Sequence, residues 1–471
     1  MFNQNPKAKI MKKISILLIS AVLFFTTGCD KYIEGYDLSP NSPTQVTPAL
    51  LLSTIEVSTF ATFNGGVNRA ASVFTQQLEG TAEQMKDVAN YVLLEGDNVN
   101  EWNSIYTDCI VEANGLIDLA GADNPYYVGI AKIIKALNLS VATDMWGDVP
   151  NREAGLGIKG EAYFSPNYDS QEIVYQDIQA LLSEAIELLS KDPADNKIIP
   201  ADDDFIHGGD ATKWVNTAWI LKARFANRLS KRDETSADKV LEYLGNLDGN
   251  ATDAMAMFGT NSSELNPWYA FNNERGTYIR MGAFYVDLLK SISDPRLPFF
   301  CATDGAGEYT GATPGSENVD ASMIGPLYGE TPNPIPLVSL VEAKFLEAEA
   351  YMRKNNAGAA AQAHNDAIKA SVLQVTGADD DAYYAAQASE TASTISMAKI
   401  MTHKYVALFL QLENYNDWRR TGIPALTPNN GPNVENGGVI PVRFPTPQDE
   451  RINNPNATVN PDINQNVWWA N

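Results

Sequence analysis

Apolar residues recur along most of the chain at the spacing of an α-helix. In residues 170–192 they are separated by three or four positions, and acidic residues lie between them. The repeating apolar positions of this segment are Val174, Ile178, Leu181, Ala185 and Leu188. This period places them on one face of a helix that packs against a core. Similar patterns predict helices at 101–120, 127–144, 212–230, 337–353, 357–374 and 394–412.

Some of the predicted helices come as pairs joined by a short turn. Residues 340–372 read as one helix, the turn "NNAG" at 355–358 and an alanine-rich second helix. This arrangement resembles tetratricopeptide repeats, although their consensus is not sustained. Strand signals are sparse and confined to short pieces such as "GGVIPVRFP" at 437–445. We therefore expect a mainly all-α fold, with a tetratricopeptide-like helix-pair scaffold and few short strands.

The helical period stops between about 250 and 336, where Gly, Pro, Asn and Thr dominate and aromatic residues are scattered. Long irregular segments inside a domain often carry function, so we expect a loop-rich second lobe here. The stretch "NPWYAFNNERG" at 266–276 mixes aromatic rings, which stack on sugars, with amide and charged groups. Packing of the loops onto the helices is the favoured role for any single ring, and the ligand-binding interpretation applies to the segment as a whole. The candidate ligand-binding residues are Trp268, Tyr269, Phe271, Tyr309 and Tyr328.

The N-terminal residues have the organisation of a secretory signal. Lys12 and Lys13 precede a charge-free apolar run at 14–25, and small residues follow at 26–28. The run is shorter than the roughly 20 apolar residues of a membrane-spanning helix. A glycine then precedes Cys29, which resembles the lipobox of bacterial lipoproteins, in which the cysteine is acylated. A plain secreted protein with an incidental cysteine is the alternative.

The expected organisation has three parts. Residues 1–28 form a lipoprotein signal peptide, whose translation starts at Met1 or Met11. Residues 29–47 form the acylated N-terminus and a polar, proline-containing tether. Residues 48–471 form one helical-repeat domain that includes the loop-rich segment.

The charge balance narrows the range of partners. The whole chain has 34 basic and 58 acidic side chains, and residues 1–28 contribute four lysines and no acid. The remaining chain therefore has a formal charge of 30 − 58 = −28. Such a surface repels phosphate backbones, so we exclude nucleic acid as a partner. Cys109 and Cys301 either form one disulfide or remain buried thiols.

Motifs for catalysis, metals and cofactors are missing or lack their context. His207, His364 and His403 are too dispersed for a zinc site, and HExxH is absent. "GLGIKG" at 155–160 matches a dinucleotide-binding pattern but lacks the flanking strand and helix. The acidic runs at 202–204 and 379–381 lack the order of a calcium-binding loop, and solvated acids are the simpler interpretation. We expect neither a metal nor a cofactor. A pair of glycosidase carboxylates is neither supported nor excluded.

Seven stretches, in order, resemble one family across nearly the whole chain. They lie at 39–52, 136–154, 208–230, 293–300, 333–353, 403–426 and 440–456. The segment "MWGDVP" at 145–150 and the segment "NDWRRTG" at 416–422 are the most diagnostic parts. On these motifs the chain is identified as a member of the SusD/RagB family of outer-membrane lipoproteins, in its SusD-like subgroup. Lys404 and Tyr405 stand where a Gln-Lys-Trp-type start is common in the family.

The resemblance implies four tetratricopeptide-like helix pairs and a variable loop-rich lobe. It also implies a surface-exposed lipoprotein that covers a SusC-like TonB-dependent transporter and captures nutrient, usually oligosaccharide, without catalysis. The motif residues combine charges with large rings, which favours buried networks that organise the fold over a ligand site. They are Asp144, Trp146, Asp148, Asp417, Trp418, Arg419 and Arg420. A helical glycan-degrading enzyme and a peptide- or protein-binding scaffold remain alternatives.

Overall fold

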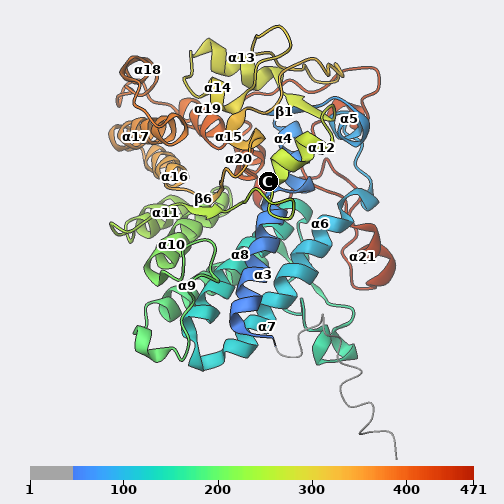
Figure 1. The fold of residues 1–471 in the computed structure, drawn as a ribbon, viewed down its shortest axis with the longest axis vertical. Helices are drawn as coiled ribbons and strands as arrows, with labels where there is room; N and C mark the ends of the chain where they lie inside the picture. The colour runs from blue at the N-terminus through green and yellow to red at the C-terminus, as the bar shows by residue number, and fades with distance from the viewer. Residues whose placement is uncertain (1–45) are drawn as a thin grey trace, which may run out of the picture. The chain divides into compact units, whose positions relative to one another are not determined.

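Helices dominate the computed structural model, which describes residues 46–471 (Figure 1). The predicted signal peptide, Cys29 and nearly all of the tether lie outside the described residues. The α-helices of the N-terminal half are α3 (Pro48–Asn64), α4 (Gly66–Phe74), α5 (Glu83–Ala89), α6 (Val99–Asn103), α7 (Val111–Ala120), α8 (Pro125–Trp146), α9 (Gln171–Leu189), α10 (Ala211–Arg228) and α11 (Ser236–Leu244). Those that follow are α12 (Pro267–Glu274), α13 (Ala283–Ser291), α14 (Leu297–Phe300), α15 (Pro326–Gly329), α16 (Leu340–Arg353), α17 (Ala357–Thr376), α18 (Asp381–Gln387), α19 (Met397–Ala407), α20 (Glu413–Thr421) and α21 (Gln448–Asn453). None of the described helices is long and apolar enough to cross a membrane.

Helix α9 shows how the local sequence produces an element. The hydroxyl of Ser170 accepts a hydrogen bond from the backbone N–H of Ile173 at 3.4 Å, which caps the first turn. Three of the predicted core positions are buried, but Leu181 and Leu188 are only half-buried. Their neighbours, Leu182 and Leu189, are fully covered instead. The apolar face is therefore wider than a single line of residues, because α9 packs against α8 and α10 on different sides.

Helices that follow one another in sequence pack side by side and form the predicted scaffold. Helix α8 packs against both α7 and α9, α10 packs against α11, and α16 packs against α17. The α8–α9 contact is close: a Cβ atom added at Gly129 would lie 2.7 Å from Cγ of Leu189. Small residues at such positions let helix backbones approach each other. The mainly α-helical, tetratricopeptide-like expectation is confirmed.

The loop-rich segment builds a second hydrophobic core above the scaffold (Figure 1). Strand β5 (Ile279–Met281) pairs antiparallel with β1 (Leu78–Gly80), which follows α4. This pairing ties the loop-rich lobe to the N-terminal part of the chain. The other short strands also pair in twos: β2 (Val149–Pro150) with β3 (Tyr168–Asp169), and β4 (Ala254–Ala256) with β6 (Ile335–Val338).

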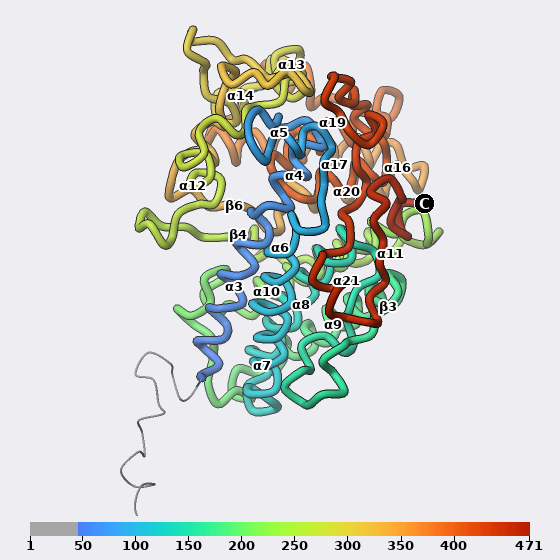
Figure 2. Tube along the Cα trace, turned by 90° about the vertical axis from the view of Figure 1, so that its right-hand side faces the viewer, coloured from blue at the N-terminus to red at the C-terminus, as the bar shows by residue number. Residues whose placement is uncertain are grey.

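The predicted strand at 437–445 is wrong. Its backbone makes single hydrogen bonds to unrelated partners: the N–H of Val442 donates to the carbonyl of Ile463, and that of Phe444 donates to the carbonyl of Met145. A strand needs successive bonds to one neighbour, and this segment instead runs along the helical scaffold (Figure 2). The two cysteines left open by the sequence, Cys109 and Cys301, are buried free thiols.

Candidate functional site

The β1–β5 pairing brings two distant segments together, because α4 precedes β1 and α12 precedes β5. Arg69 on α4 places its guanidinium carbon 4.4 Å from the ring centroid of Phe271 on α12. Tyr278 meets the same Phe271 ring edge to face, with centroids 6.1 Å apart. Phe271 is half-buried, so part of its ring remains open to solvent.

A cavity of about 420 Å³ lies beside Arg69, and we call it the α4–α5 cavity. Figure 1 shows α4, α5, α6 and α12 on the same side of the molecule. Its walls come from α4, α5 and the segment 92–101. The polar residues that line it are Arg69, Gln84, Asp87, Asp97, Asn98, Asn100 and Glu101. The cavity is within the size range of small-molecule sites and is unusually rich in hydrogen-bonding groups.

Two polar atoms of this wall are buried and lack a hydrogen-bond partner within residues 46–471: Oε2 of Glu101 and Oδ1 of Asn98. Burial raises the pKa of the Glu101 carboxyl, although Arg69 and a backbone N–H of Gly66 oppose the change. Burial also lowers the pKa of Arg69, against the attraction of Glu101. For both groups, the free-energy cost of burial therefore exceeds the gain from their charge and hydrogen-bond partners. A ligand that supplies hydrogen bonds would reduce this cost.

A glycine makes room for a charged side chain at one point of this wall. A Cβ atom at Gly66 would lie 2.0 Å from Oε1 of Glu101, far inside van der Waals contact. The missing side chain lets the Glu101 carboxylate reach the start of α4, where backbone N–H groups are free of helical partners. The cavity offers a cation, a carboxyl group and an amide to one ligand, and the half-buried ring of Phe271 lies against the cation. Groups of these kinds bind hydroxyl-rich rings.

The predicted aromatic residues occupy different environments. Among the contacts of the described residues, only Phe271 of these five forms a cation–ring contact with a residue that lines the α4–α5 cavity, which is Arg69. Trp268 is 0% exposed and Tyr328 is 5% exposed, and both lie in the second core. A ligand reaches neither ring in this conformation. Tyr269 and Tyr309 are half-buried, and ligand contact for them stays a prediction.

Arg69, Asn98 and Glu101 are not among the binding residues that the sequence predicted. A signal for them exists in "GGVNRAAS" at 65–72, where glycines and polar residues interrupt an otherwise apolar helical region. A second lies in "EGDNVNE" at 95–101, a polar run that leads into the predicted helix 101–120. Neither stretch contains the clustered aromatic rings on which the prediction depended.

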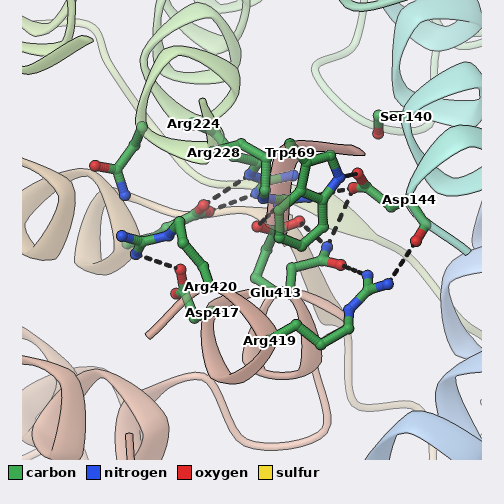
Figure 3. Close-up of polar contacts among 12 residues, drawn as sticks. Ser140, Asp144, Arg224, Arg228, Glu413, Asp417, Arg419, Arg420 and Trp469 are labelled. Atoms are coloured by element: carbon green, nitrogen blue, oxygen red, sulfur yellow. Dashed lines mark hydrogen bonds and ion pairs between the residues drawn. The ribbon is translucent and has the colours of Figure 1, made fainter. Parts of the chain in front are cut away.

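The diagnostic motifs form a buried ionic network (Figure 3). Arg228 bridges the carboxylates of Asp144 and Glu413, and the indole Nε1 of Trp469 donates to Asp144 at 2.8 Å. Arg419 donates to the carbonyl oxygen of Asp144 at 2.6 Å. Burial alone would raise the pKa of the Glu413 carboxyl, but Arg228 and Arg224 hold it well below its usual value.

A second cluster continues the network. Glu349 pairs with Lys404 at 2.8 Å and with Arg420 at 2.5 Å, and Asp417 pairs with both of these cations. Lys404, which departs from the common family pattern, thus forms buried ion pairs with two carboxylates. Asp144, Trp146, Asp417, Arg419 and Arg420 are buried and bonded within the fold, which supports the prediction that the motifs are architecture, whereas Asp148 and Trp418 are half-buried.

The acidic run at 202–204 also has a structural role. The Asp204 carboxylate accepts hydrogen bonds from the backbone N–H groups of Ile206, His207 and Gly209. The indole Nε1 of Trp214 also donates to it, at 2.7 Å. Its oxygens are saturated by the turn that they stabilise. Within the described part of the chain, no group of three His, Cys, Asp or Glu side chains could hold a metal ion.

One known protein family matches most of this chain. A family model described as starch-binding and associating with the outer membrane matches residues 40–447. The chain belongs to this SusD-like family. No curated protein sequence matches the chain.

Solved structures of SusD-like proteins share the fold. A chitin-binding protein is 24% identical, covers 90% of this chain and 100% of its own, and superposes with a TM-score of 0.76. A SusD/RagB family protein from Bacteroides thetaiotaomicron is 23% identical, over 90% of this chain and 99% of its own, with a TM-score of 0.72. A chitin-binding SusD homologue from Flavobacterium johnsoniae is 21% identical, over 89% of this chain and 98% of its own, with a TM-score of 0.76.

Proposed function

We propose that the protein captures oligosaccharide at the cell surface in the α4–α5 cavity and delivers it to a SusC-like TonB-dependent transporter. Acyl chains on Cys29 would hold it in the outer membrane, since a triply acylated terminus anchors stably where one chain does not. The observation that carries the binding proposal is the Arg69–Phe271 contact at the edge of a polar cavity. The protein acts by binding, without a catalytic step.

Two further points support the choice of ligand. The family model describes starch binding, and two similar structures are of chitin-binding proteins. Both polymers consist of pyranose rings with an apolar face and a rim of hydroxyl or amide groups. The ring face of Phe271 suits the first feature, and the unpartnered oxygens of Glu101 and Asn98 suit the second.

Isothermal titration of the full chain with maltoheptaose and chitohexaose tests the site. Phe271→Ala and Arg69→Ala should each weaken binding at least about tenfold, because each removes one side of the stacked pair. Phe164→Ala is the matched control, since Phe164 is 66% exposed and does not line the cavity. Equal affinities for wild type and both site variants would refute the assignment. Release of reducing ends from starch or chitin would instead favour the enzyme alternative.

The anchor and the partner need separate measurements. Mass spectrometry of the native protein should find an acylated N-terminus at Cys29, and a chain cleaved elsewhere would contradict the anchor. Affinity purification of the tagged full chain from outer membranes should recover a SusC-like transporter. Recovery of the chain alone, under conditions that keep outer-membrane complexes intact, would contradict the delivery step.

A further inference from the structure

A second cavity, of about 450 Å³, lies in the helical scaffold, and we call it the α9–α11 groove. It is bounded by α9, the end of α10, α11 and the C-terminal turn Trp468–Ala470. It shares no lining residue with the α4–α5 cavity. The C-terminal Trp468 and the α11 residues Lys239 and Tyr243 line it together.

Two aromatic rings line this groove, and each is held in place from one side. The guanidinium carbon of Arg232 lies 5.2 Å from the ring centroid of Trp468, and its Nε donates to the carbonyl oxygen of Trp468 at 2.8 Å. Tyr243 packs against Trp219 with centroids 5.8 Å apart, and Lys222 lies 4.7 Å from the centroid of its ring. Both Trp468 and Tyr243 are only half-buried. The groove therefore presents two fixed ring surfaces.

The charged lining residues of the groove balance, because the acids Glu172 and Asp233 face the bases Arg232 and Lys239. Lys239 pairs with Asp233 at 2.7 Å, and Arg232 is committed to the carbonyl of Trp468. The lining of the groove therefore has no net formal charge that would attract a phosphate or carboxylate ligand. An anion is a poor fit for this surface.

Uncharged hydrogen-bonding groups remain unused. Oε1 of Gln179 is buried and has no hydrogen-bond partner in the described residues, while Nε2 of the same side chain donates to the carbonyl of Lys222. Gln176 lies one helical turn earlier and is exposed, and its side-chain amide makes no hydrogen bond to any described residue. One side of the groove thus carries two amide groups, and the rings of Trp468 and Tyr243 supply apolar surface.

We propose that the α9–α11 groove is a second carbohydrate subsite that binds a short run of neutral pyranose rings. Stacking on Trp468 and Tyr243 provides the contact area, and the amides of Gln176 and Gln179 bind ring hydroxyl groups. This subsite goes beyond the proposed function, which places the ligand in the α4–α5 cavity. Only the choice of sugars as probes rests on that function.

Titration of the full chain with maltotriose and with chitotriose tests the subsite, because a trisaccharide is short enough to report each cavity separately. Wild type should bind two equivalents of at least one of these sugars. Trp468→Ala should reduce this to one equivalent, and Gln176→Ala should weaken the same event at least about threefold. Gln176 is exposed, so its variant decides the question if Trp468→Ala fails to fold. Phe164→Ala serves as the control for an exposed aromatic residue.

The outcomes separate the two proposals. A single event that Phe271→Ala abolishes and that Trp468→Ala and Gln176→Ala leave unchanged overturns the second subsite and leaves the proposed function intact. A single event with the opposite pattern supports the α9–α11 groove and overturns the α4–α5 assignment. Absence of binding to both trisaccharides overturns the subsite, and the longer oligosaccharides then decide the proposed function alone.

Discussion

Replacement of Glu79 by glutamine is expected to change how stability depends on pH. Glu79 lies in β1, is 2% exposed, and accepts one hydrogen bond from the backbone N–H of Gly315 at 2.8 Å. Arg280 stands opposite it in β5, but its guanidinium donates to the carbonyls of Gly276, Ile279 and Val319 instead. Glu79 thus has no ion-pair partner within residues 46–471. Burial therefore raises the pKa of its carboxyl from 4.5 to about 8.

The sign and size of the effect follow from this pKa. Because the folded protein holds the Glu79 proton more tightly than the unfolded chain, the contribution to stability is complete below pH 4.5 and disappears as pH rises through about 8. One pKa unit corresponds to about 1.4 kcal/mol, so the loss for Glu79 between pH 5 and pH 9 is about 4 kcal/mol. Glutamine has nearly the shape of the protonated acid and does not titrate.

Urea unfolding of wild type and Glu79→Gln at several pH values measures this loss. The free energy of unfolding of wild type, relative to the variant, should fall by about 4 kcal/mol between pH 5 and pH 9. Glu161→Gln, at an exposed position, should show the wild-type pH profile. Parallel curves for wild type and Glu79→Gln would refute the reasoning, because they would mean that the buried carboxyl titrates alike in both states.

Three other predictions concern the buried parts of the fold. Asp144→Asn should lower the free energy of unfolding by about 3–5 kcal/mol, since it leaves a buried guanidinium without its full counter-charge, and a loss below about 1 kcal/mol in urea unfolding would contradict this. Burial raises the pKa of the Cys109 thiol to about 12 and that of Cys301 to about 11, so both should react with Ellman's reagent only after unfolding; reaction in the native state would contradict their burial. Gly80→Ala should destabilise by about 1–3 kcal/mol or more, because the added Cβ would lie 1.7 Å from the carbonyl oxygen of Met85; an unchanged melting temperature would count against it.

Local sequence predicted the scaffold well because helix formation depends on short-range periodicity. The boundaries of α9, α16 and α17 follow from apolar spacing and from caps such as Ser170, all contained within a few turns of chain. The strand prediction at 437–445 failed for the opposite reason. A strand depends on a partner, and the neighbours of this segment are set by the way the C-terminal chain crosses the scaffold.

The candidate site was predicted only in part. The aromatic stretch at 266–276 drew attention to Phe271, whose ring does lie at the edge of a polar cavity. Composition could not separate Phe271 from Trp268, three positions earlier, because both rings lie on α12 and pack against the second core, where only Trp268 is fully buried. Arg69 and Glu101 lie in polar stretches that contain no aromatic ring, so the search for stacking residues passed over them.

The sequence by itself determined the fold class, the family and the structural role of the charged motifs. Periodicity and ordered motifs are properties of the chain read in one dimension, and they survive without knowledge of contacts. Only the tertiary structure decided where the cavities lie. The pairing of β1 with β5 joins residues about 200 positions apart and sets Arg69 against Phe271. The α9–α11 groove likewise needs the C-terminal Trp468 to return to helices formed some 230 residues earlier. Such long-range closure depends on the packing of the whole domain, which no local pattern specifies.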